Sequence, residues 1–162
     1  MEVSKQGGIS MCHLRQMNAY EFEHYAEKAV HSYAAELVKS GSYSEDVSLM
    51  QAQKTYDRLL PKGLETEGQY LFHIINDTDA VIGMIWFGER PNHEGFIYDF
   101  SILEHFRNQG FGTKALELVE IEAKNKGIKK LGLHVFGHNI NAIRLYKKMG
   151  YEISNMNMSK EI

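Results

Sequence analysis

The sequence has little of what several protein classes require. It contains one cysteine, Cys12, among 162 residues, which excludes both an intrachain disulfide framework and a cysteine-based metal cluster. No apolar run reaches the length needed to span a membrane, and residues 1–10 lack the apolar stretch of a signal peptide. These features predict a protein of a reducing compartment, the cytoplasm, with no membrane partner.

A large charge excess is missing as well. The formal net charge is −3, so no basic face is indicated and a nucleic-acid partner has no electrostatic support. Hydrophobic residues make up 43% of the chain and charged residues 24%, as is ordinary for a globular protein. A chain of this length suffices for one domain with a core. We therefore predict a single domain over residues 1–162, with a flexible lead-in over 1–9.

Apolar periodicity and capping residues predict two helices in the N-terminal part, after a short strand at 11–16. Asn18 followed by Glu21 is typical of a capping box, and Gly41 would end the first helix. Ser44 would cap the second helix, which Pro61 stops. The apolar stripe of this second helix is predicted to comprise Leu49, Ala52, Tyr56, Leu59 and Leu60.

The central and C-terminal parts alternate β-rich and helical patterns. Strands at 70–75 and 80–87 form a predicted hairpin, 88–94 is expected to be a loop, and a strand at 95–103 follows. A helix after the loop at 107–112, a strand at 131–136 and a helix at about 140–149 come next. Residues 151–160 are expected to give one or two final strands. This order predicts an α/β fold, a mixed sheet with helices on both faces.

The junction between the strand at 97–103 and the following helix contains Gly110 and Gly112. Glycine lets a ligand approach the main chain closely, and a helix start presents unpaired N–H groups and a positive dipole end. Together with Arg107, these features suit a phosphate or pyrophosphate. A tight strand-to-helix turn is the simpler alternative. A nucleotide P-loop would need a lysine before Thr113, and a dinucleotide fingerprint fits the spacing poorly.

The loop Arg107-Asn108-Gln109-Gly110-Phe111-Gly112 resembles the pyrophosphate loop R/Q-x-x-G-x-G/A of the GNAT superfamily of acyl-CoA-dependent N-acyltransferases. A second segment, from Asn139 through Ala142 and Leu145-Tyr146 to Gly150-Tyr151, is similar to the family pattern N-x-x-A-x-x-L-Y-x-x-x-G-F/Y. The resemblance covers about residues 80–153. It implies a GNAT-like, mixed but mostly antiparallel sheet flanked by about four α-helices.

The resemblance also implies an activity and a cofactor site. Acetyl-CoA would give its acetyl group directly to a primary amine of a small molecule, peptide or protein, through a tetrahedral intermediate and without a metal. The pyrophosphate would lie on residues 107–112 and Thr113, while the main chain of Ile102, Leu103 and Glu104 would pair with the pantetheine arm. A backbone N–H near Ile102 or Leu103 would polarise the thioester carbonyl. Asn139 would orient the pantetheine, or cap the last helix, or do both.

Two side chains are candidates for proton transfer. Tyr146 matches the family tyrosine that protonates the leaving thiolate, a role that suits a phenol with a pKa near about 10; the alternative is a core tyrosine. The position of the family glutamate base holds Phe96. Asp99 is therefore the preferred base, with a chain of water molecules as the alternative. Acidic side chains of residues 20–63 would face the amine acceptor, although ordinary solvated helix faces explain most of them.

Two other interpretations remain open. A non-catalytic acyl-CoA-binding sensor would keep the glycine loop without turnover, and the substituted base position favours it. A nucleotide-binding regulatory domain would need the glycine loop alone, and the second segment at 139–151 counts against it. The expected partners are acetyl-CoA and an amine acceptor. A homodimer formed through sheet edges or helix faces is a further expectation.

Overall fold

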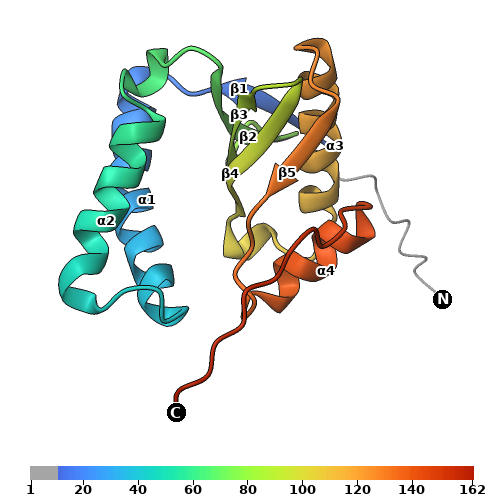
Figure 1. Ribbon diagram of the computed structural model, residues 1–162. Coiled ribbons are helices and arrows are strands. Elements are labelled where there is room, and N and C mark those ends of the chain that lie inside the picture. Colours follow the sequence, from blue (N-terminus) through green and yellow to red (C-terminus); the bar gives the residue numbers. More distant parts are fainter. Residues whose placement is uncertain (1–10) are drawn as a thin grey trace.

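The computed structural model describes residues 11–162, so the predicted lead-in over 1–9 lies outside the described residues. Five strands form one sheet in the order β1-β2-β3-β4-β5 (Figure 1). The first four strands pair antiparallel and β5 runs parallel to β4, which confirms a mixed, mostly antiparallel sheet. The strands are β1 Cys12–Gln16, β2 Gln69–Asn76, β3 Val81–Arg90, β4 Glu94–Ile102 and β5 Lys130–Leu133.

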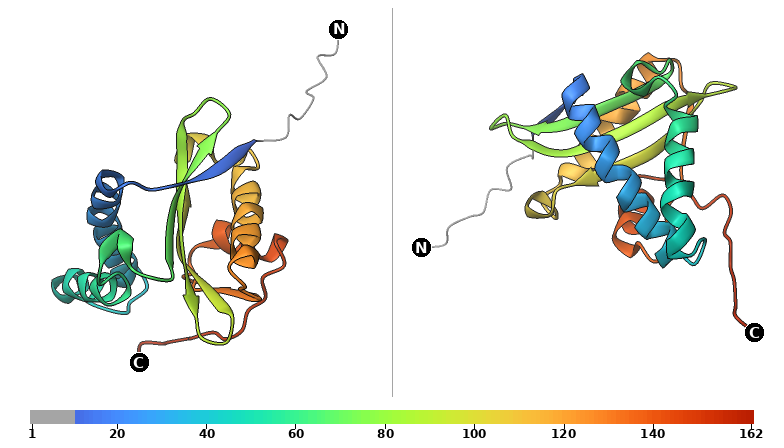
Figure 2. Two further views of the ribbon diagram at one scale, coloured as in Figure 1. Left: turned by 90° about the horizontal axis from the view of Figure 1, so that it is seen from above. Right: turned by 90° about the vertical axis from the view of Figure 1, so that its left-hand side faces the viewer.

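Helices cover both faces of the sheet, as predicted. Helices α1 (Ala19–Lys39) and α2 (Glu45–Leu59) lie on one face, and α3 (Phe111–Asn125) and α4 (Ile140–Lys148) lie on the other (Figure 2). The central strand β3 is buried on both sides, so its alternate residues feed two cores. Ile85 and Phe87 pack with residues of α3, and Met84 and Trp86 pack on the α1–α2 side.

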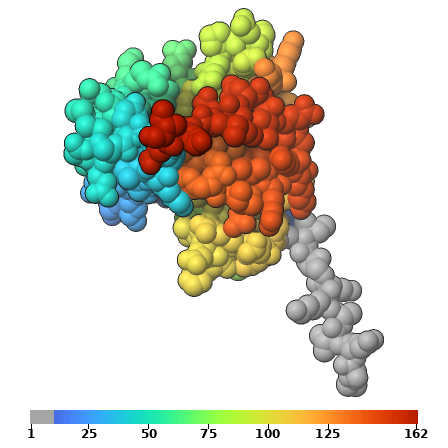
Figure 3. All heavy atoms as spheres, turned by 60° about the horizontal axis from the view of Figure 1, so that its bottom comes forward, coloured from blue at the N-terminus to red at the C-terminus, as the bar shows by residue number. Residues whose placement is uncertain are grey.

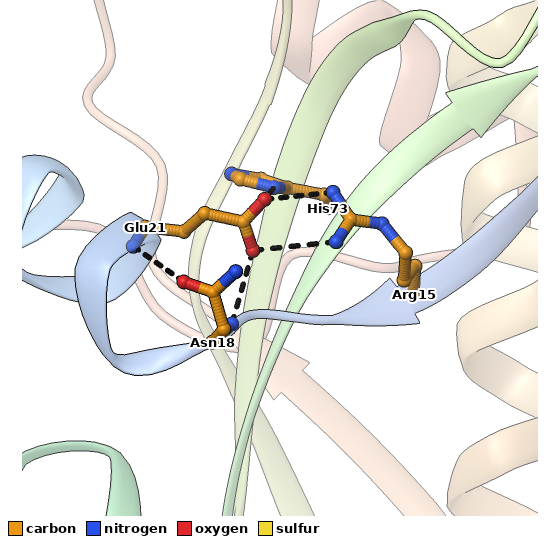
Figure 4. Close-up of polar contacts among 4 residues, drawn as sticks. All are labelled: Arg15, Asn18, Glu21 and His73. Carbon is orange, nitrogen blue, oxygen red and sulfur yellow. Dashed lines mark hydrogen bonds and ion pairs between the residues drawn. The ribbon is translucent and has the colours of Figure 1, made fainter.

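The start of α1 is tied to the sheet through Glu21. Asn18 accepts a hydrogen bond from the Glu21 N–H at 2.9 Å, and the Asn18 N–H donates to the Glu21 carboxylate at 3.0 Å, which confirms the predicted capping box. The same carboxylate accepts from Arg15 of β1 at 2.8 Å and lies 3.4 Å from His73 of β2 (Figure 4). The Glu21 carboxylate is therefore engaged in contacts that join α1 to β1 and β2, and we assign it a structural role rather than contact with an amine acceptor.

The predicted loop at 88–94 is wrong, because β3 continues to Arg90 and β4 begins at Glu94. The connection is a tight turn in which Asn92 and His93 both have positive φ, at 65° and 59°. Two such residues match the right-handed twist of a hairpin, so the two strands stay paired up to the turn. Leu49 also departs from the prediction, since its side chain is exposed rather than part of the apolar stripe of α2.

The predicted C-terminal strands are wrong too. Residues 151–162 form neither strand nor helix, and β5 ends at Leu133 instead of reaching 136. In a strand, odd-numbered and even-numbered residues point to opposite faces. The apolar residues of this tail occupy both kinds of position, with Ile153 at an odd number and Met156 and Met158 at even numbers, so a strand here could not bury them all on one face. Figure 3 shows the tail on the surface of the molecule, running from α4 toward the α1–α2 side.

Candidate active site

The sheet opens between β4 and β5. Their parallel ladder runs from the pair Glu94–Lys130 to the pair Ile97–Leu133, whereas β4 continues to Ile102. On its other side, β4 stays paired with β3, and the Leu103 N–H donates to the Ile82 carbonyl at 2.8 Å. Because N–H groups alternate between the two edges of an antiparallel strand, the Ile102 N–H points to the open side. Of the two N–H groups that were predicted as possible oxyanion donors, that of Leu103 is bonded to Ile82, so that of Ile102 is the remaining candidate.

A β-bulge re-aims the side chains of β4 beside this opening. Trp86 of β3 pairs with Asp99, but the next residue, Phe87, pairs with Ile97, which leaves Tyr98 as the extra residue. The bulge turns both Tyr98 and Asp99 toward the α1–α2 face. Tyr98 stacks on Trp86 with ring centroids 4.7 Å apart. Asp99 accepts a hydrogen bond from the Tyr25 hydroxyl of α1 at 2.8 Å.

Asp99 and Tyr146 interact electrostatically. Burial raises the pKa of Asp99, and hydrogen bonds from Tyr25 and from the Phe100 N–H offset part of that rise. Burial likewise raises the pKa of Tyr146, with further contributions from Tyr151 and from Asp99. Asp99 thus lies on β4 and contacts the α1–α2 side, whereas Tyr146 lies on α4, on the opposite side of the sheet.

The predicted anion loop forms the start of α3. Gly110 is the N-cap, with φ of 86°, and Asn108 also has a positive φ of 58°. The first hydrogen bond of the helix runs from the Lys114 N–H to the Gly110 carbonyl at 3.1 Å. Helix geometry therefore leaves the N–H groups of residues 111–113 without an acceptor inside the helix. The first turn of α3 carries no acidic residue, so a bound anion would meet no competing charge.

Other residues of the loop are fixed by contacts within the chain. The Arg107 Nε donates to the Ile102 carbonyl at 2.8 Å, and the Gln109 amide donates to the His105 carbonyl at 2.8 Å. The Phe111 side chain is buried and meets Phe106 edge to face, with ring centroids 6.3 Å apart. Phe111 could therefore contact a cofactor through its main chain alone.

Gly112 has a packing role that the sequence did not reveal. A Cβ atom at this position would lie 3.1 Å from the Leu145 side chain of α4, closer than an ordinary van der Waals contact. Gly112 thus permits the close approach of α3 and α4. Asn139 caps α4, since its side chain accepts from the Ala142 N–H at 3.2 Å. The capping alternative for Asn139 is confirmed, and its contact with pantetheine stays a prediction.

Two features lie on the α1–α2 side. A cavity of about 400 Å³ between α1 and α2 is bordered by Glu27, Tyr56 and Asp57 and lies in the region that was predicted to face the amine acceptor. Neither Asp99 nor Tyr146 lines it, but Tyr56, which does, interacts electrostatically with Asp99. In addition, Glu36 of α1 contacts His138, in the loop before α4, at 2.5 Å. This contact joins the two sides of the molecule beyond the end of β5.

Within residues 11–162, no helix is long and apolar enough to cross a membrane. No group of three or more His, Cys, Asp or Glu side chains there is placed to hold a metal ion.

A family model described as "Acetyltransferase (GNAT) family" matches residues 23–151. The uncharacterized N-acetyltransferase YdgE of Bacillus subtilis (strain 168) is 34% identical over 152 residues, which cover 92% of this chain and 97% of YdgE. The uncharacterized N-acetyltransferase YycN of the same organism is 35% identical over 152 residues, with coverage of 92% and 97%. A crystal structure of YycN superposes with a TM-score of 0.89 over 94% of this chain and 99% of that chain.

A more distant structure shares the fold. The structure of AAC(6')-Iy in complex with the bisubstrate analog CoA-S-monomethyl-acetylneamine has a TM-score of 0.58 and 17% identity, with coverage of 94% of this chain and 99% of that one. On the family model and the close relatives, the chain belongs to the acetyltransferase (GNAT) family. It is an acetyl-CoA-dependent N-acetyltransferase, so the predicted family, fold and enzyme class are confirmed.

Proposed function

We propose that the described residues form one acetyltransferase domain that transfers the acetyl group of acetyl-CoA directly to a primary amine. The observation that supports this mechanism most is the opening between β4 and β5. The edge of β4 is open beyond Ile97, the start of α3 has no capping side chain, and the half-buried Asp99 and Tyr146 interact electrostatically. We propose that the cofactor binds on the side of α3 and α4 and that the acceptor approaches from the side of α1 and α2.

The cofactor would bind through main-chain groups. The pyrophosphate would accept hydrogen bonds from the N–H groups of residues 110–113, with the α3 dipole and Arg107 supplying positive charge. The pantetheine arm would add to the open edge of β4 at Ile102, as an extra strand does, and would run on past Leu103 and Glu104, which lie just beyond the end of β4. Asn139, at the start of α4, would orient the arm. The Ile102 N–H would donate to the thioester oxygen, where negative charge develops during attack.

The reaction requires a neutral amine. For an amine with a pKa of about 10.4, roughly one molecule in 2,500 is neutral at pH 7, so deprotonation costs about 4.6 kcal/mol. Deprotonation of an α-amino group costs only about 1 kcal/mol. We propose that Asp99 accepts the proton of the ammonium group, because its raised pKa makes it a stronger base than an exposed aspartate. The neutral nitrogen then attacks the carbonyl carbon and forms the tetrahedral intermediate.

Collapse of the intermediate breaks the C–S bond, and Tyr146 would give its proton to the leaving thiolate. The raised pKa of Tyr146 keeps the phenol protonated until the thiolate forms. The acceptor class is a small molecule, peptide or protein with a primary amine. The ligand of AAC(6')-Iy, which joins CoA to an acetylated aminoglycoside fragment, supports amine acceptors for this fold.

The test is release of free thiol from acetyl-CoA across a panel of polyamines, aminoglycosides, amino acids and peptides. We expect acceptor-dependent release by the wild type, with kcat lowered about 100-fold or more in Tyr146→Phe and in Asp99→Asn. Tyr70→Phe is the matched control, because it removes a tyrosine hydroxyl, bonded to Glu89, on β2 and away from the opening. Wild-type activity in Tyr146→Phe would contradict the assigned acid. Binding of acetyl-CoA without release for any acceptor would favour the sensor module instead.

A further inference from the structure

Asp99 has a partner that belongs to a different layer of the molecule. The Tyr25 hydroxyl, from the second turn of α1, donates to Asp99 Oδ2 at 2.8 Å. The two residues lie 74 positions apart in the chain. The bulge at Trp86 and Phe87 turns Asp99 toward α1 and so makes the contact. The Tyr25 hydroxyl thus contacts Oδ2 of the carboxylate and not the other oxygen, Oδ1.

The Tyr25 side chain is also held by packing. Tyr25 and Tyr56 of α2 pack against the same buried cluster, and each affects the pKa of the other. The Tyr25 ring packs with the core around Met17, Leu71 and Trp86. Because both the ring and the hydroxyl of Tyr25 are held by contacts, the side chain keeps one orientation. A side chain fixed in this way can position the reacting group that it contacts, here the Asp99 carboxylate.

We propose that Tyr25 is a positioning residue for Asp99, which fixes Oδ2 of the carboxylate and so presents Oδ1 to the ammonium group of the acceptor. This inference rests on the proposed function, in which Asp99 is the base. Tyr25 itself does not take up the proton. Burial, together with the neighbouring Asp99 carboxylate, raises the pKa of Tyr25 well above its usual range, so the phenol stays protonated at neutral pH.

The hydrogen bond has a second consequence. A buried carboxylate loses the solvation that stabilises its charge, so its protonated form is favoured. A hydroxyl that donates to the carboxylate favours the charged form. Tyr25 therefore opposes the effect of burial and keeps a larger fraction of Asp99 ready to accept a proton near neutral pH. Without Tyr25, Asp99 would be protonated, and thus inactive as a base, up to a higher pH.

The other titratable groups that face Asp99 do not compete in this pH range. They are Tyr56 of α2 and Tyr146 of α4, and burial raises the pKa of both. A change in the acidic part of the pH profile can therefore be attributed to Asp99. Tyr25 donates to Asp99 directly, and Phe100 adds a main-chain N–H.

The experiment follows the Asp99 carboxyl by NMR in protein labelled with 13C at the aspartate side-chain carboxyl, with Asp99→Asn used to assign the signal. We expect the pKa of Asp99 to rise in Tyr25→Phe and to stay unchanged in Tyr70→Phe, which loses a similar hydroxyl–carboxylate bond elsewhere. Replacement of Tyr25 by 3,5-difluorotyrosine, a stronger donor of the same shape, should lower the pKa of Asp99. An Asp99 pKa that is the same in wild type, Tyr25→Phe and the fluorinated protein would overturn the inference.

Thiol release separates this inference from the proposed function. With an acceptor that the wild type acetylates, kcat/KM of Tyr25→Phe should fall about tenfold on the acidic side of the profile and recover as the pH rises. A loss that is equal at every pH would show a merely structural role. Wild-type rates in Asp99→Asn would refute the proposed base. An inactive Asp99→Asn beside an unshifted Tyr25→Phe would refute the positioning role alone.

Discussion

Helices α1 and α3 begin in opposite ways. At the start of α1, Asn18 and Glu21 satisfy main-chain N–H groups, and the Glu21 carboxylate places a negative charge at the positive end of the helix dipole. At the start of α3, the N-cap is Gly110, which has no side chain to offer, and the first turn has no acidic residue. The other two helices resemble α1 more than α3. Helix α2 has Glu45 and Asp46 in its first turn, and α4 is capped by Asn139.

The difference supports the proposal that the start of α3 binds the pyrophosphate. Orphan N–H groups cost free energy unless a side chain, water or an anion accepts from them. Asn18 and Asn139 fill that need at α1 and α4, whereas the predicted cap Ser44 makes no such hydrogen bond at α2, where Glu45 and Asp46 supply negative charge instead. Helix α3 has neither a capping side chain nor an acid in its first turn. The exception lies beside the open edge of β4, where the cofactor arm would run. If α3 is reserved for the pyrophosphate, an acid introduced there should act on cofactor binding and leave the fold intact.

The largest effect is expected from Thr113→Glu, which gives α3 the acid that α1 has at the same place, the third residue of the helix. A glutamate there suits the helix dipole, so folding should be preserved. Its charge would repel the pyrophosphate, and juxtaposed like charges cost several kcal/mol. We expect the dissociation constant for CoA, measured by calorimetry, to rise about 100-fold or more.

The matched control for that variant is Tyr20→Glu, at an exposed site in the first turn of α1. It adds the same charge to a helix start that already holds an acid, and the affinity for CoA should not change. Equal affinities for wild type and Thr113→Glu would place the pyrophosphate elsewhere. Gly112 is a poorer site for this test, because any side chain there meets Leu145.

Asn139→Ala should have the next largest effect. Asn139 caps α4 as Asn18 caps α1, and it is also proposed to contact the cofactor, as the start of α3 is. Loss of the cap costs about 1 kcal/mol of folding free energy, measured by denaturant unfolding. If Asn139 also orients the pantetheine, the KM for acetyl-CoA should rise by several-fold beyond any change in stability. A stability loss with an unchanged KM would leave Asn139 as a cap and nothing more.

Asn18→Ala provides the complementary result at α1. It removes the hydrogen bond from the Glu21 N–H and should lower the free energy of unfolding by about 1 kcal/mol. Because the start of α1 has a structural role and lies away from the proposed cofactor site, the affinity of Asn18→Ala for CoA, measured by calorimetry, should equal that of the wild type. Weaker CoA binding in Asn18→Ala than in Asn139→Ala would reverse the roles assigned to the two caps.

The contrast between helix starts could be predicted from the sequence because its cause is local. The Asn18–Glu21 box, the glycines of the loop and the Asn139 cap are each read within about one helical turn. The Tyr25–Asp99 contact could not be predicted, because it joins distant parts of the chain and depends on the one-residue bulge in β4. The packing role of Gly112 likewise depends on where α4 lies.

The wrong predictions have two different causes. The segment at 151–160 has strand-forming residues, but a strand also needs a partner edge, which no local pattern specifies. Conversely, the turn at Asn92 and His93 adopts positive φ at residues other than glycine, so two strands extend where the sequence suggested a loop. Local chemistry thus specified the cofactor side of the site, while the acceptor side depended on tertiary contacts.

The smallest effect concerns the acid at the start of α1. Hydrogen bonds from the Asn18 N–H and then from Arg15 hold the pKa of Glu21 below its ordinary value of 4.5. A lowered pKa contributes stability that is fully present above the unfolded-state value and is lost as the pH falls through the folded-state value. Glu21→Gln should therefore be less stable than the wild type at pH 7, and the difference should shrink below about pH 4.5.

His73 must be considered in the same measurement, since it lies 3.4 Å from Glu21 and burial lowers its pKa from 6.5. Comparing Glu21→Gln in a His73→Gln background removes that second titration, so that the remaining slope belongs to Glu21. Glu23→Gln, on the exposed side of the same helix, is the control and should change stability little at any pH. A difference that persists unchanged into strong acid would mean that the Glu21 side chain stabilises α1 through packing rather than through its charge.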